Sequence, residues 1–269
     1  MPELPEVETT RRGIEPHLRA QRIERIILRE KRLRWPISSQ VAHLQGRRIN
    51  RVTRRGKYLL MHLDRGHLIW HLGMSGSMRI LPTGSPAEAH EHVELQLGSG
   101  QALRFRDPRR FGALLYCDQD PLQHRLLQNL GPEPLGEAFT GEYLYRKCRA
   151  RSAAIKTVLM NSRIVVGVGN IYASEALFRA GIRPARAARR ISKPRMTRLV
   201  DAIRDTLAAA IESGGSTLRD FTRADGKPGY FSHEWQVYGN TGACPVCGKA
   251  IKQVTVGQRA SYYCPQCQS

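Results

Sequence analysis

The sequence predicts an α+β protein of more than one domain, with a strand-rich region followed by a helical region and a short cysteine-rich C-terminus. Short apolar segments separated by turn residues fill residues 25–117, and helical patterns fill residues 140–213. Four of the six cysteines lie after residue 243. The chain has 269 residues, which is enough for one to three domains with buried cores.

The composition excludes two classes of protein and suggests a partner. No apolar run approaches the roughly 18 residues of a membrane span. The N-terminus is acidic and contains prolines, which excludes a secretory signal, so we expect a soluble cytoplasmic protein. The formal net charge is +20, which favours a polyanionic partner such as nucleic acid, although charge can also serve solubility.

Half of this charge excess lies in residues 151–200, which hold eleven basic side chains and one acid, Glu175. Binding by counterion release needs several cations along one track, so a localised excess favours a phosphate-binding face. A solvated helical surface would give the same count. Most of the basic residues are arginine, which can bind phosphate bidentately, but a GC-rich genome also raises arginine.

The first element expected is a helix, because Leu4, Val7, Ile14 and Leu18 fall near helical spacing. Pro5 suits a first helical turn, and the acidic residues before and within that turn favour the positive end of a helix. The pair Glu15-Pro16 predicts where the helix ends.

Short strands follow. Eight segments have strand character, and turn residues such as Asp64-Arg65-Gly66 separate most of them. This number and spacing predict a β-sandwich or barrel. The segments are Arg25–Leu28, Ile49–Thr53, Tyr58–Leu63, His67–Leu72, Ser77–Leu81, His92–Leu97, Ala102–Phe105 and Ala113–Cys117.

The pattern changes at Gly131–Gly136, whose two prolines and two glycines predict a linker. Helical signals then continue to about Ser213, with Asp201–Ile211 as the clearest case and Gly214-Gly215 as its stop. The polar segment between Gly215 and Gly229 is too long for a simple connector.

The last four cysteines form a C-x2-C-x16-C-x2-C pattern, which is typical of a four-thiolate zinc site. They are Cys244, Cys247, Cys264 and Cys267. Two disulfides or a redox motif are alternatives, but the chain lacks a secretion signal and the surroundings of a redox motif. Between the pairs, Ile251–Val256 and Arg259–Tyr263 alternate like a hairpin with Gly257-Gln258 at its tip. Arg259 could reach a phosphate there, but taken alone it is more simply a solvated hairpin residue.

Pro2 follows the initiator methionine, and a small second residue is compatible with removal of that methionine. The α-amine of Pro2 would then titrate near pH 8, so part of it is a neutral nucleophile at pH 7. Such an amine can form a Schiff base with a sugar aldehyde carbon, and the adjacent Glu3 could move the protons. Locally, the simpler interpretation is that Pro2 and Glu3 only begin a helix.

Taken together, these motifs resemble the bacterial formamidopyrimidine-DNA glycosylase family, which repairs 8-oxoguanine, along the whole chain. The first matching block is Pro2-Glu3-Leu4-Pro5-Glu6-Val7-Glu8-Thr9. Further blocks are Arg55–Tyr58, His71–Ser77, Asp107–Gly112, Gly131–Pro134, Val166–Glu175, Asp225–Tyr230 and the cysteine-rich end. One departure is Gly56, which stands where alanine is common.

The resemblance implies three domains. Residues 1–131 would form an N-terminal catalytic β-sandwich domain with flanking helices. Residues 132–230 would form a helix–two-turn–helix DNA-binding domain whose loop 215–230 covers the extruded base. Residues 235–269 would form a zinc ribbon holding one structural Zn2+. A bacterial monomer is expected, cytoplasmic and associated with the nucleoid while it scans DNA.

The resemblance also implies roles for single residues. Pro2 would attack C1′ of a flipped nucleotide and Glu3 would act as acid/base. Lys57 would donate a proton in β-elimination and Arg259 in δ-elimination. Met74, Arg109 and Phe111 would fill the void left by the flipped base, with Arg109 on the orphaned cytosine. The other DNA-contacting positions would be His90, Arg151 and Asn170.

Two alternative functions stay open. One is an endonuclease VIII-like glycosylase for oxidised pyrimidines, a branch that typically begins Pro-Glu-Gly-Pro, whereas this chain has Leu4. The other is a non-catalytic zinc-ribbon protein that binds DNA through its basic face alone.

Overall fold

The computed structural model describes residues 2–215 and 235–269. The chain folds into two compact units. Unit 1 comprises residues 1–128 and 213–230, and unit 2 comprises residues 129–212 and 231–269. No helix within the described ranges has the length and apolar character needed to cross a bilayer.

Unit 1 is a sandwich of two four-stranded antiparallel sheets, with strand orders β1-β6-β7-β5 and β2-β3-β4-β8. The first sheet contains β1 (Ile23–Leu28), β6 (Glu91–Leu97), β7 (Gln101–Arg106) and β5 (Ser77–Pro82). The second contains β2 (Ile49–Arg55), β3 (Tyr58–Leu63), β4 (His67–His71) and β8 (Ala113–Cys117). All eight predicted strands are confirmed, and the sandwich is confirmed over the barrel. Short 3-10 turns, η1 (Ser39–His43) and η2 (Pro121–Gln123), complete the unit.

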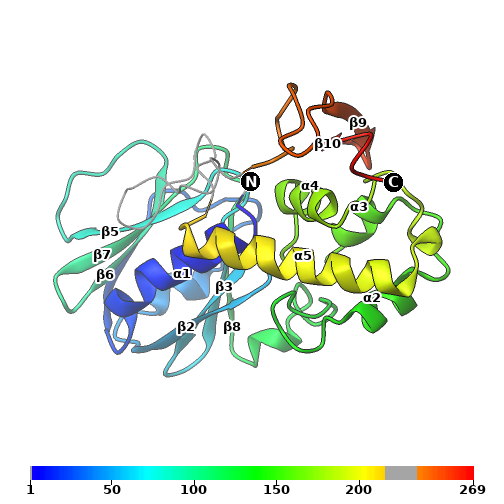
Figure 1. Cartoon of the computed structure of the whole chain (residues 1–269). Coiled ribbons are helices and arrows are strands. Elements are labelled where there is room, and N and C mark those ends of the chain that lie inside the picture. Colours follow the sequence, from blue (N-terminus) through cyan, green and yellow to red (C-terminus); the bar gives the residue numbers. More distant parts are fainter. Residues whose placement is uncertain (1, 216–234) are drawn as a thin grey trace. The chain divides into compact units, whose positions relative to one another are not determined.

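The core of unit 1 lies between these sheets. Apolar side chains from both inner faces meet there. The rings of Trp70 and Phe105 pack edge to face, with 5.4 Å between their centroids. Helix α1 (Leu4–Leu18) contributes Val7, Ile14 and Leu18 to the same core. The buried stripe of α1 therefore fixes the N-terminal segment against the sandwich, as Figure 1 shows for the blue helix.

The predicted end of α1 at Glu15-Pro16 is wrong, because the helix continues to Leu18. A proline in the last turn costs one intrahelical hydrogen bond. Leu18 is fully buried in the core, and Arg19 N donates to Glu15 O at 2.9 Å. Burial of Leu18 thus holds the final turn in helical form.

Unit 2 is helical, with a two-stranded ribbon. It contains α2 (Gly141–Cys148), α3 (Ile155–Leu159), α4 (Asn170–Arg179), the 3-10 turn η3 (Ala188–Arg190) and α5 (Lys193–Glu212). The predicted hairpin is present as β9 (Lys252–Val256) and β10 (Arg259–Tyr263). Helix α5 packs on α2 and α4, and α4 packs on β10 (Figure 1).

The segment predicted as a linker is packed onto unit 2. Gly131 N donates to Ser162 O at 2.8 Å, and Val166 N donates to Pro132 O at 3.2 Å. A Cβ on Gly131 would lie 2.6 Å from the backbone of Ile164, so only glycine allows this approach. The three predicted domain ranges, 1–131, 132–230 and 235–269, stay predictions.

Candidate active site and nucleic-acid interface

The N-terminal residues are held inside unit 1. Glu3 is the N-cap of α1 and forms a capping box with Glu6, in which Glu3 N donates to Glu6 Oε2 at 2.7 Å. Pro2 is buried, and the exposed fractions of Glu3 and Glu6 are 2% and 0%. The positive end of a helix stabilises carboxylates at this position. The start of α1 is thus a fixed, buried site with a carboxyl group beside Pro2.

Two contacts connect α1 to other parts of this candidate site. Arg54 Nε donates to Glu8 Oε2 at 3.1 Å, which ties the helix to the end of β2. Gly215, the first residue of the predicted capping loop, packs against Glu6, because a Cβ there would lie 3.3 Å from Glu6 Cγ. Residues 216–230 of that loop lie outside the described residues.

Lys57 occupies the two-residue turn between β2 and β3. Gly56 has a φ of +57°, and the pairing of Arg55 with Tyr58 closes the turn. An L-residue adopts this left-handed conformation only at a cost, so glycine suits position 56. The departure at Gly56 is therefore compatible with the turn that presents Lys57.

His71 was not among the residues that the sequence singled out. Burial, together with the charges of Lys57 and Arg34, lowers the pKa of His71 to about 4. Gly73 N donates to His71 Nδ1 at 2.9 Å, so the ring is neutral and carries its proton on Nε2. With Arg34, Met74 and Phe111 it lines a hollow of about 510 Å³. The only signal in the sequence was its place in the block that contains Met74.

Asp107 organises the loop that follows β7. It is fully buried, accepts from Ser75 Oγ at 2.7 Å through Oδ1, and accepts from Gly112 N at 2.7 Å through Oδ2. Ser75 Oγ also accepts from Arg109 N at 3.2 Å. One carboxylate thus fixes both ends of loop 107–112 and joins it to the loop that carries Met74.

The three residues expected to fill the void, Met74, Arg109 and Phe111, lie on these two joined loops. The Arg109 guanidinium lies over the Phe111 ring, 5.1 Å from its centroid. Phe111 is 45% exposed, which is unusual for a large apolar side chain. A Cβ on Gly73 would lie 2.4 Å from the Phe111 backbone, so the loops meet backbone to backbone. The structure therefore brings all three together as a protruding group.

His90 lies beside the same loop. Its backbone has a φ of +69°, and its carbonyl accepts from Asp107 N at 3.0 Å. The loop before it is held by the buried Arg104, which donates to Pro86 O at 2.8 Å and Glu91 Oε2 at 3.0 Å. These contacts present the exposed His90 on a fixed backbone.

In unit 2, Asn170 begins α4 after the turn Gly167–Gly169. Gly167 has a φ of +81°, and Gly169 is the N-cap without a side-chain hydrogen bond. Asn170 Nδ2 lies 3.4 Å from Tyr238 Oη, and its buried Oδ1 has no partner within the described ranges. The N-terminal end of a helix attracts anions, so the start of α4 is compatible with the DNA contact that the resemblance implies for Asn170.

Glu175, the single acid of the basic stretch, positions Tyr238. Its carboxylate is buried and accepts from the backbone N–H groups of residues 236, 237 and 238 at 2.9, 3.0 and 2.7 Å. The Tyr238 ring packs edge-on against the rings of Trp235 and Tyr262, with centroid distances of 5.2 and 5.6 Å. No sequence pattern indicates this arrangement, because the partners are about sixty residues apart.

Arg259 is the exposed first residue of β10, opposite Val256 at the hairpin tip. The fully buried Lys156 holds this strand, because Nζ donates to Ser261 Oγ at 2.7 Å and to Ala260 O at 3.1 Å. Arg151 is also exposed, and its Nε donates to Lys147 O at 2.8 Å.

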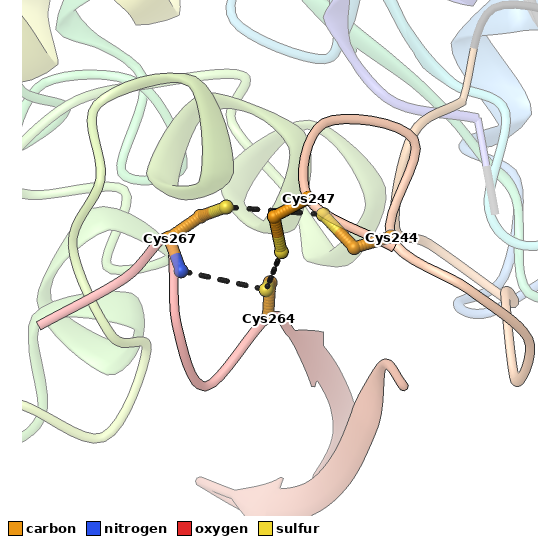
Figure 2. Close-up of side chains that lie close together, drawn as sticks. All are labelled: Cys244, Cys247, Cys264 and Cys267. Atoms are coloured by element: carbon orange, nitrogen blue, oxygen red, sulfur yellow. Dashed lines mark hydrogen bonds between the residues drawn. The ribbon is translucent and has the colours of Figure 1, made fainter. Parts of the chain in front are cut away.

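The four cysteines of the ribbon meet at one point (Figure 2). Their sulfur atoms all lie within 4.8 Å of one another, with Cys247 Sγ 3.4 Å from Cys264 Sγ and Cys244 Sγ 3.9 Å from Cys267 Sγ. Disulfide sulfurs lie about 2.05 Å apart, which excludes that pairing. Tetrahedral zinc with Zn–S bonds of about 2.3 Å separates its sulfurs by about 3.8 Å. The cluster fits one structural Zn2+ with four thiolates.

Comparisons with known proteins agree with this geometry. The formamidopyrimidine-DNA glycosylase N-terminal domain matches residues 1–114, the H2TH domain of the same family matches residues 130–222, and a zinc finger found in FPG and IleRS matches residues 243–269. Proteins named formamidopyrimidine-DNA glycosylase from Pseudomonas aeruginosa and Stutzerimonas stutzeri are 58% and 59% identical over the full length of both chains.

Solved structures with the same fold belong to the same family. The crystal structure of the MutM (Fpg) protein from Thermus thermophilus has a TM-score of 0.89 at 40% identity and covers 99% of this chain and 98% of its own. The Lactococcus lactis Fpg in complex with DNA that contains an abasic site has a TM-score of 0.92 at 34% identity over 99% of each chain. With its sandwich, H2TH helices and zinc ribbon, this chain belongs to the formamidopyrimidine-DNA glycosylase family.

Proposed function

We propose that this protein is a base-excision DNA repair enzyme that removes oxidised purines from duplex DNA and then nicks the strand as an AP lyase. The support is the family membership and the relatives solved with damaged DNA, including a mutant of Lactococcus lactis Fpg with Fapy-dG DNA and Lactococcus lactis Fpg with abasic-site DNA. Its substrates would be 8-oxoguanine and formamidopyrimidines.

The chemistry would begin at Pro2 once Met1, which lies outside the described residues, has been removed. The neutral Pro2 nitrogen attacks C1′ of the flipped nucleotide, and the C1′–N bond to the base breaks. Glu3 donates a proton to the ring oxygen as the sugar opens. The product is an iminium ion, the cationic Schiff base of a secondary amine, which links Pro2 to the opened sugar, and the proton of the Pro2 amine leaves with the base.

Strand scission would follow by β- and then δ-elimination. Lys57 supplies a proton in the first step and Arg259 in the second, and both are cations suited to the phosphates beside the lesion. The Met74, Arg109 and Phe111 group fills the vacated stack. His90, Arg151 and Asn170 bind the DNA backbone. Zn2+ supplies folding energy to the ribbon that carries Arg259 and takes no part in the chemistry.

The observation that carries this proposal is the burial of Pro2 and Glu3 at the start of α1. A chain terminus is ordinarily mobile and exposed. Here a capping box holds Glu3 at 2% exposure directly beside the proposed nucleophile. Burial of a carboxyl group next to an amine is costly for stability alone and suits proton transfer.

Borohydride trapping on an 8-oxoguanine duplex tests the proposal. The wild type, with loss of Met1 confirmed by mass, should form a covalent protein–DNA adduct. Protein that retains Met1 should form none, and Glu3→Gln should excise the base at least about a hundredfold more slowly. Glu24→Gln, a change of an exposed carboxylate in unit 1, is the matched control and should behave as wild type.

The absence of an adduct from processed wild type would reject the lyase activity and favour a non-catalytic DNA-binding protein. Faster excision of thymine glycol than of 8-oxoguanine would instead favour the oxidised-pyrimidine glycosylase. We further propose that the enzyme acts as a cytoplasmic monomer associated with the nucleoid while it scans DNA. Sedimentation with and without a lesion duplex checks its oligomeric state.

A further inference from the structure

The guanidinium group of Arg54 connects helix α1 to the turn that carries Lys57. Its Nε donates to Glu8 Oε2 at 3.1 Å, and its Nη1 donates to Gly56 O at 2.9 Å. All four residues belong to unit 1, so these contacts lie within one compact body. One side chain thus joins the helix that begins beside the proposed nucleophile to the turn of a proposed proton donor.

The strand β2 places Arg54 on the inner side of its sheet. Side chains alternate along a strand, so Arg54 lies on the same face as Val52, which is buried in the core of unit 1. Helix α1 packs against β2 and contributes to the same core. The side chains of Arg54 and Glu8 are only 12% and 11% exposed. Water and salt screen a pair of this kind much less than an exposed one.

The Glu8 carboxylate is a firm anchor for this guanidinium group. It also accepts from Arg11 Nη2 at 2.8 Å and from Arg12 Nε at 3.0 Å. Burial alone would raise the pKa of Glu8, but the arginines around it outweigh burial and lower this pKa below its usual value. Glu8 is therefore ionised at neutral pH and holds Arg54 by a charge-assisted hydrogen bond.

The anchor lies close to the start of the same helix. Glu8 follows Glu3 by five residues, which corresponds to about 7.5 Å along the helix axis. The capping box fixes Glu3 beside Pro2 at the start of this distance. The helix thereby sets the position of Arg54 relative to the proposed nucleophile.

The second bond of Arg54 acts on the peptide unit that joins Gly56 to Lys57. The β2–β3 ladder ends at the pair of Arg55 and Tyr58, so this peptide unit lies outside the ladder. Its carbonyl accepts from Arg54, and its nitrogen belongs to Lys57. Because a guanidinium group is planar, its two donors point in fixed directions. The position of α1 therefore restrains the backbone from which the Lys57 side chain leaves.

We propose that Arg54 is a positioning residue that holds Lys57 at the distance from Pro2 that strand cleavage requires. The inference rests on the proposed function, in which Pro2 forms the Schiff base and Lys57 supplies a proton in β-elimination. Schiff-base formation uses Pro2 and Glu3, which the capping box holds without Arg54. A displaced Lys57 should therefore slow β-elimination and spare the earlier step.

The test separates the two steps on a duplex that contains a preformed abasic site. Borohydride trapping measures the Schiff base, and single-turnover strand cleavage measures elimination. Arg54→Lys keeps the charge but lacks the planar pair of donors, whereas Arg54→Gln removes the charge. Arg12→Gln is the matched control, because Arg12 also donates to Glu8 but is 57% exposed. Circular dichroism and urea unfolding verify folding, and Arg54→Lys suffices if Arg54→Gln does not fold.

We expect both Arg54 variants to cleave the abasic duplex about 10- to 100-fold more slowly than wild type, because small misplacements of a catalytic group have effects of this size. The yield of trapped adduct should be at least that of wild type, since the Schiff base forms normally and persists longer. Arg12→Gln should cleave within about twofold of wild type, because an exposed ion pair contributes little.

A double variant tests whether Arg54 acts through Lys57. In the Lys57→Ala background, Arg54→Lys should slow cleavage by no more than about twofold further, because two changes that remove one function are not additive. A merely structural role of Arg54 would give the same loss in both backgrounds and would reduce trapping and cleavage together.

Wild-type cleavage by a folded Arg54→Lys protein would overturn the inference. Equal losses of trapping and cleavage, full additivity with Lys57→Ala, or the same slow cleavage in Arg12→Gln would also overturn it. In each of these cases a wild type that forms the adduct and cleaves leaves the proposed function intact. The absence of an adduct from processed wild type would instead reject the proposed function and this inference with it, so the two failures are distinguishable.

Discussion

Replacement of Asp107 should uncouple the group formed by Met74, Arg109 and Phe111 from the rest of unit 1. The Asp107 carboxylate is fully buried and accepts one hydrogen bond from Ser75 and one from Gly112. Asp107→Ala removes both acceptors and leaves the Gly112 N–H and the Ser75 hydroxyl buried without them. Asp107→Asn keeps the shape, and its amide can still accept from Gly112 N while it donates to Ser75 Oγ.

The magnitude follows from these two bonds. A hydrogen bond to a charged group contributes about 1.5–3 kcal/mol, so Asp107→Ala should lower the free energy of unfolding by about 4 kcal/mol. Asp107→Asn keeps both hydrogen bonds but removes the negative charge that strengthens them, so it should lower the free energy of unfolding by about 1–2 kcal/mol. Ser75→Ala should cost about 1–3 kcal/mol. Because Asp107 and Ser75 share one bond, the double alanine variant should cost less than the sum of the single changes, by about 1.5 kcal/mol.

Urea unfolding at pH 7 measures these free energies, and excision from duplexes with cytosine or adenine opposite the lesion measures the functional effect. Asp107→Ala should lose most of the discrimination for the opposite base, because Arg109 N is bonded to Ser75 Oγ and the loop depends on both. Asp118→Ala is the matched control, since Asp118 is exposed. Its effect on stability should be about 0.5 kcal/mol or less.

Two results would refute this reasoning. One is a free energy of unfolding for Asp107→Ala within about 1 kcal/mol of wild type, which would mean that the buried bonds contribute little. The other is full opposite-base discrimination in a folded Asp107→Ala protein, which would mean that another contact positions Arg109.

Three further predictions concern pH, zinc and Tyr238. The pKa of His71 is about 4 in the folded protein, below its ordinary value of 6.5. As the pH falls, His71 therefore takes up a proton in the unfolded chain before it does so in the folded protein. This difference should lower the free energy of unfolding by up to about 3 kcal/mol from pH 6.5 to pH 4. Urea unfolding at pH 7 and pH 4 should show a smaller fall in His71→Asn, and an equal fall would contradict this. Cys264→Ala should reduce bound zinc from one to none in a chromogenic chelator assay, whereas Cys148→Ala should retain it. Glu175→Ala should cost about 3–5 kcal/mol of stability and weaken DNA binding, because three backbone N–H groups lose their acceptor, and wild-type stability and affinity would argue against this role.

Much of the fold was predictable because its signals are local. Alternating apolar residues and turn residues mark the eight strands, and Gly214-Gly215 marks the end of α5. The end of α1 was the exception, because Pro16 is a local breaker while Leu18 is held by long-range burial. A local rule and a packing contact gave opposite answers there, and the packing contact decided the structure.

The residues of the candidate site also differ in whether the sequence carries a local signal for them. The cysteine spacing identified the metal ligands, and the N-terminal block led to the prediction that Pro2 and Glu3 are catalytic. His71 and Glu175 were not identified, because their importance arises from burial and from partners elsewhere in the chain. Burial sets the protonation state of His71, and Glu175 acts on backbone groups more than sixty residues away.

The sequence by itself therefore determined the order of elements, the zinc ligands and the chemical groups at the N-terminus. These depend on spacing and residue type, which a linear pattern records. Only the tertiary structure decided that Glu3 is buried in a capping box, that Asp107 joins two loops into one protruding group, and that Arg54 links α1 to the turn of Lys57. Desolvation and hydrogen-bond geometry depend on which distant residues meet, and that is settled only when the chain packs.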